Sequence, residues 1–150
     1  MIRACRSDDI DTLMQIWLDA NLCAHSFIPK TYWTDHYEQV KHMLPQAELY
    51  VYEEERSGEI EGFIGLTEDY IAGIFVREQY RSKGIGKQLL NYAKSFKQRL
   101  SLNVYQKNER AVHFYQREHF VVQSEHTDEA TGENEYVMIW RGDHPCSLGF

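Results

Sequence analysis

The stretch Arg81-Ser82-Lys83-Gly84-Ile85-Gly86 is the most informative part of this sequence for its fold. It stands between an apolar run that ends at Val76 and an amphipathic run that begins at Ile85, which predicts a strand, a glycine turn and the start of a helix. The first backbone N–H groups of a helix lack partners within the helix and carry the positive end of its dipole, so a phosphate binds well there. Glycines at 84 and 86 let the backbone approach such an anion closely.

Cationic side chains surround this turn in a chain that is otherwise acidic. Arg81, Lys83 and Lys87 gather here, whereas the 150 residues carry a formal net charge of -7. A nucleotide P-loop requires a glycine where Arg81 stands and a Ser or Thr where Gln88 stands. A dinucleotide fingerprint requires a glycine where Leu89 stands. Both of these phosphate loops are therefore excluded.

The turn resembles the Q/R-x-x-G-x-G/A signature of the GNAT superfamily of acyl-CoA-dependent N-acyltransferases, through Arg81, Gly84 and Gly86. A second segment, Asn108-Glu-Arg-Ala-Val-His-Phe-Tyr115, is similar to the N-x-x-A-x-x-F/Y-Y element that follows the glycine loop in that family. Two motifs in the family's order, separated by one predicted helix and one predicted strand, are far more specific than either alone. The resemblance covers residues 2–140 and implies that the loop binds the pyrophosphate of coenzyme A.

Length and composition favour a single domain. The chain has 150 residues, 43% of them hydrophobic, and no Pro/Gly/Ser-rich linker, so we expect one domain over residues 1–142 and a tail at 143–150. Neither a signal segment nor a run of membrane-span length is evident, which predicts a cytoplasmic protein without a membrane partner. The acidic balance predicts no nucleic-acid partner. Three isolated cysteines predict no disulfide framework and no metal site.

The order of predicted elements gives a mixed α/β fold. Strands are expected at residues 2–5, 49–54, 60–68, 70–76, 100–105, 120–127 and 135–140. Helices are expected at residues 7–18, with a cap from Ser7 and first-turn charge from Asp8 and Asp9, and at 31–44, 85–96 and 108–118. Strands interrupted by helices predict helices on both faces of a central sheet. The resemblance adds a V-shaped splay between the fourth and fifth strands.

The resemblance assigns the donor, acetyl-CoA, to the splay and the glycine loop. It implies that backbone N–H groups of Ile74, Phe75 and Val76 face the thioester and the pantetheine arm, and that the Asn108 side chain hydrogen-bonds that arm. It implies that the phosphates lie on the loop and helix start, formed by Arg81, Ser82, Lys83, Gly84, Ile85, Gly86 and Lys87. Tyr115 takes the family position of the acid that protonates the departing thiolate, and a phenol with an ordinary pKa of about 10 is protonated at neutral pH.

The base that would deprotonate the acceptor amine is not fixed by the sequence. Two positions that hold a glutamate in some GNAT enzymes are Tyr70 and Asn103 here, and neither serves as a base. Glu68, His25 or a chain of water molecules could take the proton, and we favour water. Tyr70 is expected to position the substrate.

The acceptor is expected to bind between the first two helices and the C-terminal hairpin, where the family selects its substrates. The residues expected to contact it are Phe27, Ile28, Tyr32, Trp33 and Asn103, beside Tyr70. Aromatic side chains there could seat the stem of a lysine and hold a cation by π interaction.

These features predict an N-acetyltransferase that moves an acetyl group to a primary amine by direct attack in a ternary complex. Cys23 and Cys146 lack a recognisable base, which disfavours a covalent acyl-enzyme. The string from Val104 to Asn108 is typical of small bacterial stand-alone acetyltransferases, some of which act on protein lysines. Protein N-termini and small-molecule amines are alternative acceptors, a non-catalytic acyl-CoA-binding module is an alternative function, and the protein is expected to be a monomer or a homodimer.

Overall fold

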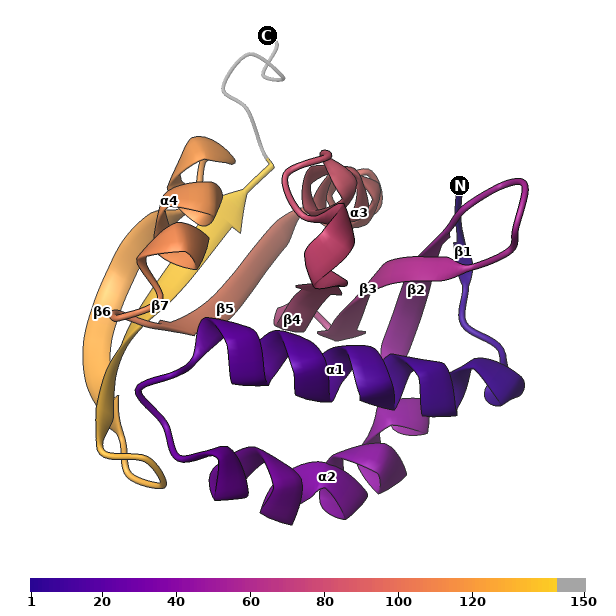
Figure 1. Cartoon of the computed structure of the whole chain (residues 1–150). Helices are drawn as coiled ribbons and strands as arrows, with labels where there is room; N and C mark the ends of the chain where they lie inside the picture. Colours follow the sequence, from indigo (N-terminus) through magenta and orange to yellow (C-terminus); the bar gives the residue numbers. More distant parts are fainter. Residues whose placement is uncertain (143–150) are drawn as a thin grey trace, which may run out of the picture.

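The computed structural model describes residues 1–142; the predicted tail, with Cys146, lies outside the described residues. The described chain forms one mixed sheet with helices on both faces, as predicted (Figure 1). Its strands are β1 (Ile2–Ala4), β2 (Glu48–Glu53), β3 (Ile60–Thr67), β4 (Tyr70–Val76), β5 (Arg99–Tyr105), β6 (Val121–Asp128) and β7 (Glu133–Arg141). Its helices are α1 (Ile10–Ala24), α2 (Lys30–Met43), α3 (Ile85–Lys94) and α4 (Glu109–Arg117). Each predicted strand and helix is present, and most ends agree to within about two residues; α1, however, runs to Ala24, six residues beyond its predicted end.

The sheet has the order β1-β2-β3-β4-β5-β7-β6, and β4 and β5 form its parallel pair. That pair is joined only at its start: Tyr70 is in register with Ser101, and the Ser101 N–H donates to the Asp69 carbonyl at 2.9 Å. Beyond this point the two strands diverge. The splay predicted between the fourth and fifth strands is therefore present, and it leaves backbone groups of both strands without a ladder partner.

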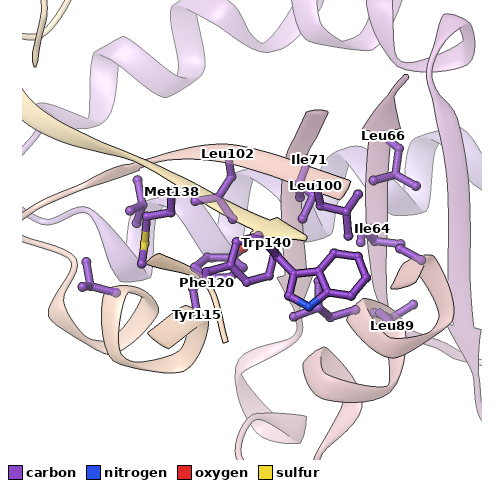
Figure 2. Close-up of a cluster of buried hydrophobic side chains, with 14 of the residues drawn as sticks. Ile64, Leu66, Ile71, Leu89, Leu100, Leu102, Tyr115, Phe120, Met138 and Trp140 are labelled. Atoms are coloured by element: carbon purple, nitrogen blue, oxygen red, sulfur yellow. The ribbon is translucent and has the colours of Figure 1, made fainter. Parts of the chain in front are cut away.

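Two hydrophobic cores flank the sheet. The α1 and α2 helices lie on one face, and α3 and α4 lie on the other (Figure 1). Figure 2 shows the second core, in which Tyr115 of α4 lies beside Phe120 among apolar side chains of the sheet and of α3. Among the described helices, none combines the length and the apolar character that crossing a bilayer would require.

The start of α1 differs in detail from the prediction. Residues Ser7–Asp9 form a 3₁₀ turn, and the capping oxygen comes from Asp9, which accepts the Arg6 N–H at 2.8 Å, and not from Ser7. Arg3 lies 2.8 Å from the same carboxylate and lowers the pKa of Asp9. An ion pair of low exposure between β1 and the turn therefore fixes where α1 begins.

Candidate active site

The open edge of β4 is the first component of the site. The Arg77 N–H donates to the Glu61 carbonyl of β3 at 2.9 Å. Because N–H groups alternate in direction along a strand, the Phe75 N–H also points toward β3, whereas those of Ile74 and Val76 point into the splay. The expectation that Phe75 contributes with its neighbours is therefore wrong, and its ring packs on Phe63 instead, with centroids 5.0 Å apart.

A pocket of about 950 Å³ opens at this edge, between α1 and the N-terminal ends of α3 and α4. Most of the residues predicted to bind the donor line it: Ile74, Val76, Arg81, Ser82, Gly84, Ile85, Gly86, Lys87, Asn108 and Tyr115. Lys83 does not line the pocket, and its ammonium lies over the Tyr80 ring, 5.8 Å from the centroid. The Lys83 side chain therefore does not form the wall of this pocket, and its contact with the phosphates stays a prediction.

The glycine loop presents unpaired donors to the pocket. Gly84 is the N-cap of α3 with φ of 83°, a conformation that glycine adopts without strain, and no side chain caps the helix. The first hydrogen bond of α3 runs from the Gln88 N–H to the Gly84 carbonyl, so the N–H groups before Gln88 lack helical partners. The buried Arg81 Nε has no hydrogen-bond partner among residues 1–142. These donors match an anionic ligand.

Further arginines that the sequence motifs did not single out line the same pocket. Arg77, Arg110 and Arg117 add positive charge, and Arg110 donates to the Ser82 hydroxyl at 2.8 Å. Arg110 lies inside the second motif, so its presence near the loop could have been inferred from the topology. Arg117 comes from the far end of α4, and no local pattern points to it.

Tyr115 lies in the pocket wall with a hydroxyl group that has no partner. Its side chain is 8% exposed and packs edge-on against Phe120, with ring centroids 5.4 Å apart. Its hydroxyl forms no hydrogen bond with another group within residues 1–142, and the side chain lines the pocket. Burial, with a smaller effect from Tyr70, raises the pKa of Tyr115 above its ordinary value. Tyr115 is therefore a protonated donor at neutral pH.

Asn108 and His25 connect the donor pocket to the segment between α1 and α2. The Asn108 Oδ1 accepts the Ala111 N–H at 3.3 Å and caps α4, while its Nδ2 lies 3.1 Å from the His25 Nε2. The His25 ring stacks on Trp33, with centroids 5.3 Å apart, and burial lowers the pKa of His25 to about 4. His25 is therefore a neutral structural partner of Asn108 at neutral pH.

The other candidate base lies away from the pocket. Glu68 is exposed in the turn between β3 and β4, with φ of 55°, and it does not line the pocket. The structure thus brings His25 to the edge of the site and leaves Glu68 outside the donor pocket.

The residues predicted to contact the acceptor fall into two groups, one accessible at the surface and one buried in the core. Tyr70 is 40% exposed and Phe27, Tyr32 and Asn103 are half-buried, so all four can meet a ligand. Ile28 and Trp33 are only 3% and 7% exposed and belong to the core beneath α1 and α2. Their direct contact with an acceptor, expected from the sequence, is not available in this conformation, because core packing occupies both side chains.

Polar residues of the C-terminal hairpin complete this surface, and sequence reasoning missed them. The Asn103 Nδ2 lies 3.4 Å from Glu135 Oε1 and 3.3 Å from His126 Nε2, and the Tyr105 hydroxyl donates to Asp128 at 2.8 Å. With these residues, the site joins a cationic donor pocket to an aromatic and acidic surface. No cluster of three or more His, Cys, Asp or Glu side chains suited to a metal ion occurs among residues 1–142.

Comparisons with known proteins agree with this geometry. The family model for an acetyltransferase (GNAT) domain matches residues 45–122. The peptidyl-lysine N-acetyltransferase YiaC of Escherichia coli K12 is 32% identical over 142 residues, covering 93% of this chain and 96% of that protein. The peptidyl-lysine N-acetyltransferase YjaB of the same strain is 32% identical over 121 residues, covering 81% and 82%.

Solved structures give the same result for the fold. The solution structure of apo-form YjaB from Escherichia coli has a TM-score of 0.83 at 28% identity, covering 95% of this chain and 98% of that one. The structure of yncA from Salmonella typhimurium with its cofactor acetyl-CoA has a TM-score of 0.68 at 15% identity, covering 96% and 94%.

Proposed function

This chain belongs to the GNAT family and is an acyl-CoA-dependent N-acetyltransferase, and we propose that its acceptor is the side-chain amine of a lysine in a protein. Two relatives named peptidyl-lysine N-acetyltransferases, each 32% identical, support this acceptor. The observation that carries the transfer chemistry is the Tyr115 side chain, which is 8% exposed and lines the donor pocket with a hydroxyl that has no hydrogen-bond partner within residues 1–142. It is a proton donor at the place where the splay opens.

The residues of the pocket fit acetyl-CoA as the donor substrate. The pyrophosphate would accept hydrogen bonds from the N–H groups at the start of α3 and from the orphaned Arg81 Nε. The pantetheine arm would lie along the open edge of β4 and receive the Ile74 and Val76 N–H groups as a neighbouring strand would. The Asn108 amide stands at the same mouth.

The chemistry then needs three contributions from the protein. Backbone N–H groups of the open β4 edge stabilise the negative charge that develops on the thioester oxygen when the amine attacks. Tyr115 gives its proton to the sulfur as the carbon–sulfur bond breaks, and its raised pKa keeps that proton in place beforehand. The lysine amine must be neutral to attack, so it first loses a proton.

Water is the acceptor of that proton in this proposal. The pKa of His25, lowered to about 4 by burial, is far below that of a lysine ammonium, and the imidazole already accepts a hydrogen bond from Asn108. Glu68 does not line the pocket. Water reaches the surface beside the half-exposed Tyr70 directly.

An acceptor panel tests the proposed function. The protein is mixed with acetyl-CoA and, in turn, N-terminally blocked peptides with one lysine, unblocked peptides without lysine, spermidine and an aminoglycoside, and the release of free thiol is followed. The proposal predicts that kcat/KM for thiol release is highest with the blocked lysine peptides. Fastest release with another class would replace the acceptor, and tight acetyl-CoA binding without release on any acceptor would reject transfer altogether.

A further inference from the structure

The acceptor side of the sheet carries a row of polar side chains created by strand pairing. Tyr105 of β5 is in register with Glu135 of β7, which is in register with His126 of β6. Residues paired across antiparallel strands point to the same face, so these three lie side by side. Asn103, two residues before Tyr105, shares this face and contacts both Glu135 and His126.

Three carboxylates lie on this face, and two of them already have partners. Asp128 accepts the Tyr105 hydroxyl at 2.8 Å, and Glu133 forms an ion pair with Lys107 at 3.1 Å. Glu135 is half-buried and has no cationic partner within residues 1–142; its hydrogen-bond partner is the neutral Asn103 amide at 3.4 Å. A carboxylate without a cationic partner is free to accept a charge-assisted hydrogen bond from an ammonium group that reaches it.

Glu135 also lies near the point where the splay opens, because its partner Asn103 stands two residues beyond Ser101, which is in register with Tyr70. Burial raises the pKa of Tyr70, and the negative charge of Glu135 raises it further. Tyr70 in turn raises the pKa of Tyr115, an effect smaller than that of burial. Tyr115 is nine-tenths buried and its unpartnered hydroxyl marks the place of the leaving thiol. A cation held at Glu135 therefore lies on the acceptor side of that place.

We propose that Glu135 binds the ammonium group of the acceptor lysine and makes the enzyme selective for cationic amines. Asn103 orients the carboxylate through its amide, and the exposed Tyr70 ring flanks the approach for the aliphatic stem. When the ammonium loses its proton to water, the neutral amine is released from the carboxylate and advances to the thioester. This inference rests on the proposed function, because it assumes a lysine acceptor.

The test compares Glu135→Gln with a matched control, Glu125→Gln. Glu125 lies on the same hairpin but is paired with Tyr136 on the opposite face of the sheet, and its carboxylate accepts from Gln106. Each variant loses one negative charge. Both are assayed with a blocked single-lysine peptide and with the same peptide in which an aminooxy group, uncharged at neutral pH, replaces the lysine amine.

We expect Glu135→Gln to raise KM for the lysine peptide by about tenfold or more, the size of one charge-assisted hydrogen bond. Its kcat, its KM for acetyl-CoA and its KM for the aminooxy peptide should stay within about twofold of wild type, as should every constant of Glu125→Gln. Glu135→Ala, checked for unchanged acetyl-CoA affinity as a sign of folding, should show the same pattern.

Two results would overturn the inference: an unchanged KM for the lysine peptide in Glu135→Gln, or an equal loss with the charged and the uncharged peptide. Failure of the proposed function looks different. In that case the wild-type protein itself does not acetylate the lysine peptide, and the role of Glu135 in lysine binding falls with it.

Discussion

The Nδ2 of Asn108 lies 3.1 Å from the Nε2 of His25, although 83 positions separate the two residues in the sequence. The contact joins the start of α4 to the end of α1 at the mouth of the donor pocket. Asn108 Nδ2 can only donate, so His25 Nε2 accepts and is unprotonated. The proton of the neutral ring is then on Nδ1, which is buried and has no partner within residues 1–142.

Separate atoms of Asn108 are expected to serve stability and binding. Asn108→Ala should lower the free energy of unfolding by about 1 kcal/mol, because the cap on the Ala111 N–H is lost, and should weaken acetyl-CoA binding. Asn108→Asp keeps a capping oxygen but loses the Nδ2 that contacts His25, so it should be less destabilised than Asn108→Ala and still bind acetyl-CoA more weakly. Urea denaturation and calorimetric titration measure the two effects. Equal destabilisation by both substitutions would refute the capping role.

His25 is expected to make the folded protein sensitive to acid. Its folded pKa of about 4 lies below the ordinary 6.5, so between these values the unfolded chain binds more protons. The free energy of unfolding should therefore fall as pH drops from 6.5 to 4, with up to about 3 kcal/mol coming from this ring. His25→Gln, which can still accept from Asn108, should show a flatter dependence in urea denaturation over this range. Identical slopes would mean that His25 is not held neutral.

Tyr115 is expected to act in the chemical step alone. Tyr115→Phe removes the hydroxyl and keeps the ring packing on Phe120, so kcat should fall by about 10²–10⁴-fold while the affinity for acetyl-CoA and the melting temperature are retained. Because burial raises the pKa of Tyr115, wild-type kcat should not decline below about pH 10 through loss of this proton. Steady-state kinetics across pH measure both. A Tyr115→Phe enzyme with wild-type kcat would remove the acid from the mechanism.

Arg81 and Lys83 are expected to differ although both belong to the glycine loop. Arg81→Ala removes the guanidinium whose buried Nε has no hydrogen-bond partner within residues 1–142, so the Kd for acetyl-CoA should rise about tenfold or more. Lys83 does not line the pocket, so Lys83→Ala should change the Kd by no more than about twofold, the effect of one exposed charge. Titration of each variant with acetyl-CoA provides the comparison, and equal losses would show that net charge alone holds the donor.

The fold was largely predictable because its signals are local. The apolar stripes of α1 and α3, the turn at Gly84 and the breaks between strands follow from short-range periodicity. Ser7 was predicted as the cap from its residue type. The oxygen that accepts the Arg6 N–H belongs instead to Asp9, whose carboxylate is paired with Arg3 of β1, and the sequence alone does not show that pairing.

The donor pocket and the acceptor surface differ in how far the sequence alone predicts their residues. The donor pocket is built from two contiguous motifs, so Arg81, Gly84 and Asn108 could be named in advance. Glu135 could not be named in advance, because its contact with Asn103 depends on the register between β7 and β5. The orientation of Phe75 was missed for a related reason, since which N–H groups face the splay depends on the pairing of β4 with β3.

The position of the acetyl group on one peptide identifies the acceptor amine of the enzyme directly. A peptide with a free α-amino group and one internal lysine is incubated with the enzyme and acetyl-CoA, and fragmentation in a mass spectrometer locates the added acetyl group. Lysine acetylation predicts the label on the side-chain nitrogen, with the α-amine unmodified. A label on the α-amine, or none while acetyl-CoA binds tightly, would contradict the assignment of protein lysine as the acceptor.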